Sequence, residues 1–197
     1  TEEDDEIDIG CAGGMDVTAR REYSTELLQG SGFNITIKGL QGGHSGIDIH
    51  LGRGNANVIM ARLLMAGLPY NIQLLSMDGG SLRNAIPREA KAQFVVVDSS
   101  KFLVEVEKLK ISILNEFKSI EKSLEIVISE TTVSAKGLSA QDSMHLIRAM
   151  KAAHNGVYRM SPDVKDLVEA SNNVARVKLE ESKLEIMCLT RSSVDST

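Results

Sequence analysis

The chain has 197 residues, of which 42% are hydrophobic and 25% charged, a composition typical of a folded domain and not of a disordered one. Its formal net charge of −5 argues against a nucleic-acid-binding protein, which would usually carry a basic stripe. No apolar run approaches the roughly 20 residues of a membrane helix. Two distant cysteines, Cys11 and Cys188, indicate a reducing compartment, so we expect a cytoplasmic protein without membrane or nucleic-acid partners.

The first 32 residues predict little regular structure. Residues 1–8 are acidic and begin without methionine or a basic leader, as an excised piece would. Ile7 and Ile9 alternate around Asp8 as in a short strand, and the glycines of residues 10–14 should end it in a turn. Residues 18–32 are polar, as in a crossing between domains.

From Phe33 the pattern becomes regular. Phe33, Ile35 and Ile37 alternate with polar residues, which predicts a half-buried strand. Pro87 lies inside the last predicted strand of this half, so either an edge is exposed there or the strand bends. The further elements are a glycine-rich loop at 40–46, a helix at 55–67, a strand at 71–77, a turn at 78–80, a strand at 82–97 and a helix at 99–120.

The second half repeats this order of elements. A strand at 124–130 precedes a helix at 139–154, where Ser139 and Asp142 resemble a capping box. A loop at 155–164 then leads to strands at 167–179 and 183–192. The order βαββα followed by βαββ predicts an α+β fold of duplicated βαββ units, in which antiparallel sheets carry helices packed on one face.

His44 is the first candidate for chemistry, because glycines flank it in the sequence Gly-Gly-His-Ser-Gly at 42–46. Glycines let the backbone approach a ligand, and such a histidine can donate a hydrogen bond to an oxygen that gains charge in a transition state. The alternative is a tight turn whose histidine faces solvent, and spacing alone favours it. His50, six residues on, does not complete a zinc-binding pair, so we expect no metal site in this chain.

Two further side chains could contact a ligand. Asn84 lies beside the proline in the strand at 82–97, and its amide can donate and accept hydrogen bonds. The alternative is a bulge residue that satisfies its own backbone. Arg191 ends a mostly apolar strand, and its planar guanidinium can bind a carboxylate through two hydrogen bonds. A solvated arginine that guards a sheet edge is the alternative there.

Taken together, these stretches resemble the aminoacyl-histidine dipeptidases, in the metallopeptidase family that includes carnosinases and glutamate carboxypeptidases. The most specific matches are His-Ser-Gly at 44–46 and Arg-Asn-Ala-Ile-Pro-Arg-Glu at 83–89. The others are Thr-Glu-Glu at 1–3, Ile-Gly-Cys-Ala-Gly-Gly at 9–14, Gly-Arg-Gly-Asn-Ala-Asn at 52–57, Asn-Gly-Val at 155–157 and Cys-Leu-Thr-Arg-Ser-Ser-Val-Asp-Ser at 188–196.

The resemblance implies a lid, or dimerisation, domain of a zinc-dependent dipeptidase that hydrolyses Xaa-His and other dipeptides. Two zinc ions would be bound by residues outside this chain, so the chain alone should be inactive. His44 would stabilise the oxyanion, Asn84 would contact the substrate, and Arg191 would bind the C-terminal carboxylate of the dipeptide. The lid would associate with its own catalytic domain and could form a homodimer.

The resemblance also divides the chain into three ranges. Residues 1–25 would be an edge of the missing catalytic domain and a crossover, 26–121 a first lid unit, and 122–197 a second unit that returns toward the catalytic domain. The alternative function is a non-catalytic α+β module that binds amino acids for regulation or interaction. That module would explain the glycine-rich loop and Arg191, but not the ordered matches along the whole chain.

Overall fold

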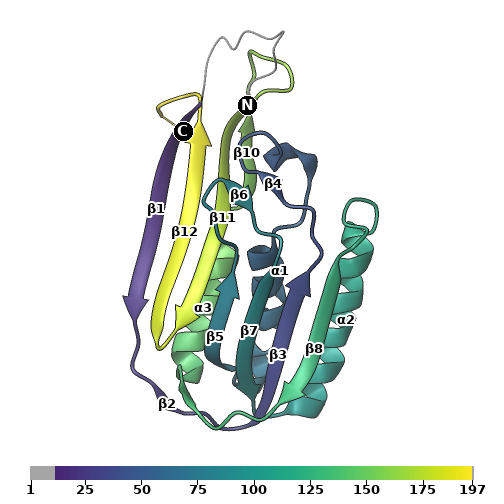
Figure 1. The fold of residues 1–197 in the computed structure, drawn as a ribbon, viewed down its shortest axis with the longest axis vertical. Helices are drawn as coiled ribbons and strands as arrows, with labels where there is room; N and C mark the ends of the chain where they lie inside the picture. The colour runs from purple at the N-terminus through teal and green to yellow at the C-terminus, as the bar shows by residue number, and fades with distance from the viewer. Residues whose placement is uncertain (1–11, 197) are drawn as a thin grey trace.

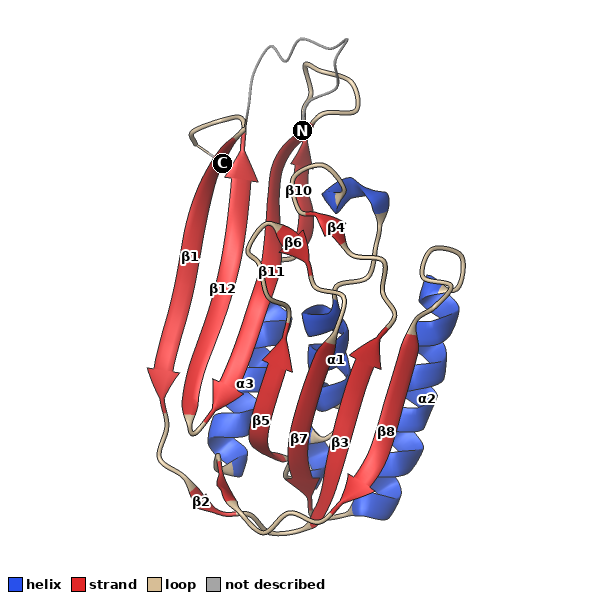
Figure 2. Cartoon of the chain, viewed as in Figure 1, coloured by secondary structure: helices blue, strands red, loops and turns tan. Residues whose placement is uncertain are grey.

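The computed structural model of the chain describes residues 12–196 and consists of one sheet covered on a single face by three helices (Figure 1, Figure 2). All strand pairings among these residues are antiparallel, in the order β1-β12-β11-β5-β7-β3-β8, with β10 paired to the first part of β11. The predicted α+β class is therefore confirmed. The main strands are β1 (Gly13–Glu22), β3 (Ser31–Lys38), β5 (Gln73–Gly79), β7 (Ala90–Val96), β8 (Glu125–Thr131), β10 (Gly156–Met160), β11 (Val168–Glu180) and β12 (Lys183–Ser192).

The helices are α1 (Ala56–Met65), α2 (Ser99–Phe117) and α3 (Ala140–Ala152), with short 3-10 turns at Ile49–Leu51 and Leu68–Tyr70. Two small ribbons complete the fold: β2 (Glu26–Leu27) pairs with β9 (Lys136–Gly137), and β4 (Gly43–His44) pairs with β6 (Ala85–Ile86). The β4–β6 ribbon lies beyond the ends of β5, β7 and β3, close to β11 (Figure 1). It carries the candidate site.

Strands from both predicted units share one sheet. β8 follows α2 in the sequence and pairs with β3 along seven residues, so it closes the sheet beside the first unit. β11 joins the other side by pairing with β5 through Val177, Lys178 and Leu179, and α3 packs next to α1. The proposed boundary between residues 121 and 122 thus falls in the short turn that precedes β8, within a continuous sheet.

The core lies between the sheet and the helices. Phe33, Ile35 and Ile37 are fully buried on one face of β3, as the alternation predicts. The rings of Phe33, Phe94 and Phe102 contact one another with centroids between 5.3 and 6.1 Å apart. Aromatic contacts at this spacing stabilise beyond the burial of area alone, so the three rings join β3, β7 and α2 into one unit.

The helices begin at capping residues. The Asn55 side chain accepts hydrogen bonds from two backbone amides at the start of α1. Ser139 Oγ accepts one from the amide of Asp142 at 3.0 Å, which confirms the predicted cap of α3. Asp98 caps α2, which ends at Phe117, three residues before the predicted end. These side chains satisfy amides that a helix itself leaves without partners.

Strand β1 corrects the prediction for the beginning of the chain. The glycine turn at 10–14 is wrong where it overlaps this strand, because Gly13 and Gly14 begin a strand that runs to Glu22. The polar stretch at 18–32 contains the end of β1, all of β2 and the start of β3. All ten of its residues pair with β12, while only one, Thr18, is even partly shielded from solvent. Backbone pairing holds this edge strand, so no buried side-chain pattern marks it in the sequence. The short strand predicted around Asp8 lies outside the described residues.

Two other predictions need correction. The strand expected at 82–97 is broken around Pro87 into β6 and β7, because proline cannot donate a ladder hydrogen bond and the chain bends there. The Pro87 carbonyl oxygen instead accepts a hydrogen bond from the Ala56 amide at 3.0 Å. The loop expected at 155–164 contains β10, whose irregular pairing with β11 includes two register shifts.

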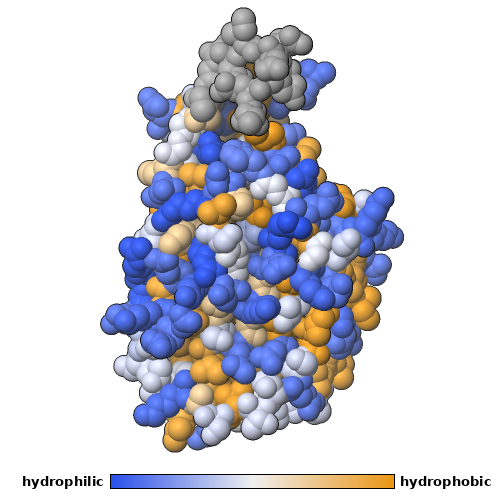
Figure 3. Space-filling view, in the orientation of Figure 1, coloured by the Kyte–Doolittle hydropathy of each residue, from blue (hydrophilic) through white to orange (hydrophobic). Residues whose placement is uncertain are grey.

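The face of the sheet opposite the helices is polar. Figure 3 shows it covered largely by hydrophilic side chains. Arg20 pairs with Glu185 at 2.6 Å across β1 and β12, and Arg176 pairs with Asp78 across β11 and β5. Within residues 12–196, no helix has the length and apolar character needed to cross a membrane.

Candidate functional site

His44 lies in the β4–β6 ribbon, opposite Ala85. The amide of Ser45, which follows it, donates a hydrogen bond of 2.8 Å to the carbonyl oxygen of Asn84. Two of the three predicted site residues, 40 positions apart in the sequence, are therefore held on neighbouring backbone segments.

Two glycines give the loop before His44 its shape. Gly42 and Gly43 have φ angles of 67° and 143°, which other residues rarely adopt. A Cβ on Gly43 would lie 2.5 Å from Asp48 Oδ2 and 2.3 Å from Arg53 Nη1. Arg53 also donates a hydrogen bond of 2.7 Å to the Gly42 carbonyl oxygen. The glycines thus let a charged pair pack directly on the backbone that carries His44.

Arg191, near the end of β12, approaches the same loop. A Cβ placed on Gly46 would lie 3.1 Å from both Arg191 Nε and His44 Cε1, so the two side chains flank this glycine. Arg191 Nε is buried and lacks a hydrogen-bond partner, and no described residue forms an ion pair with the guanidinium. Burying a donor without a partner costs about 1–3 kcal/mol. An oxygen atom of a ligand would remove that cost.

Two other polar side chains at the loop have no hydrogen-bond partner among the described residues. Ser45 is buried, and its Oγ has no hydrogen-bond partner among the described residues. The Asn84 side chain is exposed and forms no hydrogen bond with another described residue. The structure therefore brings His44, Asn84 and Arg191 to one region. The Ser45 hydroxyl follows His44 directly in the sequence.

A network of hydrogen-bonded asparagines, most of them buried, holds this region in place. Asn173, in β11, donates hydrogen bonds to the carbonyl oxygens of Arg83 and Ala85 at 3.0 and 2.8 Å. Its Oδ1 accepts one from Asn55 Nδ2 at 3.2 Å, and the same nitrogen lies 2.9 Å from Asn155 Oδ1. The network joins β11, the start of α1 and the loop that presents Asn84, so it fixes that loop on the sheet.

These asparagines were not among the site residues predicted from the sequence. Asn173 is 1% exposed and Asn55 3%, yet asparagine is usually a surface residue. A signal was present: the run Ser-Asn-Asn at 171–173 interrupts the predicted strand at 167–179. Adjacent polar residues that break the alternation of a strand can be buried side chains with specific hydrogen-bond partners.

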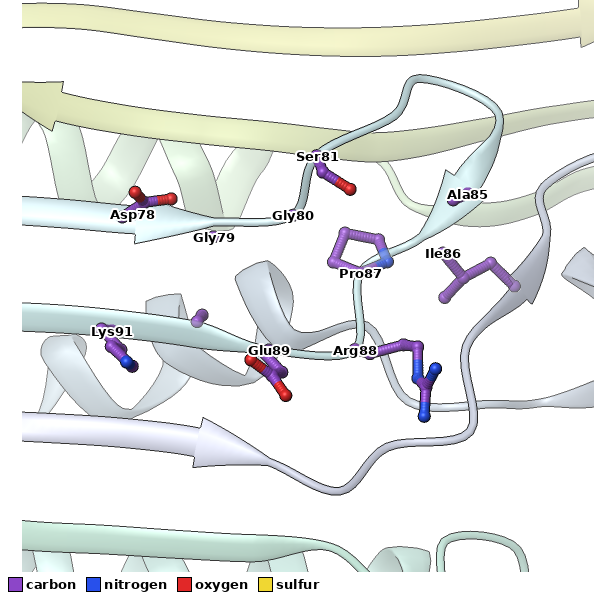
Figure 4. Close-up of a pocket in the computed structure, with 11 residues that line it drawn as sticks. Asp78, Gly79, Gly80, Ser81, Ala85, Ile86, Pro87, Arg88, Glu89 and Lys91 are labelled. Carbon is purple, nitrogen blue, oxygen red and sulfur yellow. The ribbon is translucent and has the colours of Figure 1, made fainter.

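A cavity of about 530 Å³ lies beside β6, between the Gly79–Gly80 turn and the segment around Pro87 (Figure 4). Glu89 and Lys91 contribute opposite charges to its wall. Arg88 extends toward the segment before β4, where its Nε donates a hydrogen bond of 3.0 Å to the Leu40 carbonyl oxygen. None of the three predicted residues lines this cavity. We place the candidate site at the His44 loop instead, because the unpartnered donors are there.

The groups around the loop favour binding an anion. Elsewhere in β12, beside Asn172 and His154, burial raises the pKa of the half-buried Cys188 thiol, although Asn172 and Arg83 oppose the shift, so little of the reactive thiolate forms at neutral pH. Among residues 12–196, no group of three or more His, Cys, Asp or Glu side chains is arranged to hold a metal ion. Hydrogen-bond donors and a guanidinium suit the binding of a carboxylate or of a carbonyl oxygen that gains negative charge.

Comparison with known proteins identifies the family. The family described as the peptidase dimerisation domain matches residues 35–124, from β3 to the residue before β8. Residues 35–124 of this chain belong to that family. The match contains His44 and Asn84, whereas Arg191 lies beyond it, on the part of the sheet that β11 and β12 add to the dimerisation domain.

Two relatives extend the similarity to the whole dimerisation-domain chain. The "Cytosol non-specific dipeptidase" of Escherichia coli (strain K12) is 40% identical over 205 residues, which cover 100% of this chain and 41% of the relative. The crystal structure of the aminoacylhistidine dipeptidase from Vibrio alginolyticus aligns with a TM-score of 0.89 at 37% identity, covering 95% of this chain and 39% of that one. The chain thus spans about two fifths of the relatives that it matches.

Proposed function

We propose that this dimerisation domain serves as the lid of a dipeptidase and brings His44, Asn84 and Arg191 to a dipeptide held by another domain. One observation carries the proposal: His44 and Arg191 flank the same glycine, and the buried Arg191 Nε has no partner within the described residues. Similarity to a dipeptidase along the whole chain favours this lid over a module that binds amino acids for regulation.

Each side chain has a role that its chemistry supports. Arg191 would bind the C-terminal carboxylate of the dipeptide, whose charge is present before and during the reaction. His44 would donate a hydrogen bond to the oxygen of the scissile carbonyl, which gains negative charge as water attacks. The exposed amide of Asn84 would contact the substrate between them.

Metal ions belong to the proposal as part of the complete protein. Dipeptidases of this family generally use metal ions. Among the described residues, no group of three or more His, Cys, Asp or Glu side chains is arranged to hold a metal ion. We propose that two zinc ions are bound by residues outside this chain. Bound there, they would supply the activated water. The residues of the lid would bind and orient the dipeptide and stabilise the charge that develops on it.

Closure of the lid would add these donors to the site and exclude water. The asparagine network and the Asp48–Arg53 ion pair hold the loop rigidly. Hydrogen-bond donors on rigid elements need little reorganisation when the lid closes. We also propose a cytoplasmic location and a homodimer. β5 lies inside the sheet, between β11 and β7, and offers no free edge to a second copy. A dimer would use other surfaces, such as the outer edges of the sheet at β1 and β8.

The first prediction concerns the activity of the isolated chain, which carries the lid residues without the proposed zinc ligands. The 197-residue chain, incubated with zinc and a Xaa-His dipeptide, should release no product above a buffer blank, because it lacks a metal site among its described residues. The complete protein, loaded with zinc, should hydrolyse the same dipeptide. Circular dichroism must first show that the short chain is folded. Turnover by the short chain, or a zinc-loaded complete protein that is inactive on dipeptides, would refute the proposed function.

A further inference from the structure

The ring of His44 accepts hydrogen bonds from its own turn. The backbone amides of Gly46 and Ile47 both point at His44 Nδ1, with nitrogen-to-nitrogen distances of 3.2 and 3.3 Å. A neutral imidazole has one nitrogen that accepts and one that carries hydrogen. Because Nδ1 accepts, the hydrogen must be on Nε2. The other tautomer would direct an N–H group at two further N–H groups.

The turn that supplies these amides is closed by reciprocal hydrogen bonds. The His44 amide donates to Asp48 Oδ2 at 2.8 Å, and the Asp48 amide donates to the His44 carbonyl oxygen at 2.8 Å. Arg53 Nη1 lies 3.3 Å from the same carboxylate oxygen and donates to the Gly42 carbonyl oxygen. Both charged side chains are about three quarters buried, so their interaction is less screened than that of a surface pair.

We propose that the turn at residues 44–48 fixes His44 as an Nε2–H hydrogen-bond donor, and that Asp48 and Arg53 are positioning residues that keep this turn closed. The functional meaning rests on the proposed lid: a ring that presented a bare Nε2 to the developing oxyanion would repel it. A ring locked as a donor needs no tautomer change when the substrate arrives, which is the condition under which such donors are most effective.

Nitrogen NMR of the chain labelled with ¹⁵N-histidine tests this proposal without any reaction. Spectra are recorded near pH 8.5, where histidine side chains are ordinarily neutral. His44 should show one protonated nitrogen, Nε2, and one bare nitrogen, Nδ1. The exposed rings of His50, His145 and His154 provide the reference, since they should average over both tautomers. Shifts of His44 that match this reference would overturn the proposal.

Variants then test the positioning residues. Asp48→Ala should move the His44 shifts to those of the exposed histidines, because the turn loses both the acceptor of the His44 amide and the partner of Arg53. Asp48→Asn keeps an acceptor and should retain most of the wild-type difference. Asp163→Ala, at an exposed loop position, is the matched control and should change nothing. Unchanged His44 shifts in folded Asp48→Ala would contradict the role of Asp48.

The outcomes for the tautomer and for the lid are separable. If Asp48→Ala does not fold, the wild-type spectrum still decides, through the coupling between His44 Nδ1 and the Gly46 amide nitrogen that a hydrogen bond transmits. A missing coupling together with averaged shifts refutes the fixed tautomer. A fixed tautomer in an enzyme whose turnover does not need His44 refutes the proposed function alone.

Discussion

Replacing His44 with alanine in the complete protein should, on the proposed function, lower kcat by about 100- to 1,000-fold and leave KM nearly unchanged, the effect that loss of one oxyanion donor usually has. The hydrogen bond strengthens as the carbonyl oxygen becomes an oxyanion, so its loss raises the barrier and hardly affects binding of the ground state. Steady-state kinetics with saturating dipeptide would measure both constants.

The matched control for this experiment is His50→Ala. His50 is exposed and follows the same loop, but its side chain forms no hydrogen bond with the turn at 44–48. It should behave like the wild type. Both variants must bind the wild-type amount of metal, so that any difference comes from the lid. A His44→Ala enzyme with unchanged kcat would return His44 to the role of a simple turn residue.

The second large effect concerns the buried asparagines. Asn173→Ala should lower the free energy of unfolding by about 2–4 kcal/mol, because the carbonyl oxygens of Arg83 and Ala85 lose the donor that Asn173 supplies, at about 1–3 kcal/mol for each group before relaxation. The Asn55 amide loses one acceptor but keeps Asn155 and the Val174 carbonyl oxygen. The loop that presents Asn84 should loosen as well. Urea unfolding of the 197-residue chain, followed by circular dichroism, measures the change.

The neighbouring Asn172 offers a close control. It is partly exposed and hydrogen-bonds to the His154 carbonyl oxygen and to Thr190. Water can replace these partners, so Asn172→Ala should cost only about 1 kcal/mol. Equal losses for the two variants would show that the buried network contributes nothing beyond ordinary surface hydrogen bonds.

The elements that bury one face could be predicted from the sequence. Phe33, Ile35 and Ile37 mark β3 because a half-buried strand alternates, and Ser139 marks the start of α3 because its cap depends on neighbours in the sequence. The resemblance to dipeptidases, carried by the motifs around His44 and Asn84, also led to the family that the comparisons confirm.

The features that could not be predicted depend on contacts between distant segments. β1 is held by its backbone pairing with β12 and lacks a buried face, so composition shows only a polar stretch. Both β8 and β11 attach to strands far away in the chain, which element order alone cannot reveal. The closeness of Arg191 to His44 arises in the same way, because β12 brings residue 191 to a loop 145 positions earlier at Gly46.

The most direct test of the lid compares a dipeptide with its C-terminal amide as substrates of the complete enzyme. If Arg191 binds the carboxylate, the wild type should prefer the free acid by about 10- to 100-fold in kcat/KM, the equivalent of about 1.5–3 kcal/mol for a hydrogen bond to a charged group. Arg191→Ala should nearly abolish that preference, whereas Arg20→Ala, an exposed arginine in β1, should keep it. An Arg191→Ala enzyme that still prefers the free acid as strongly as the wild type would contradict the account.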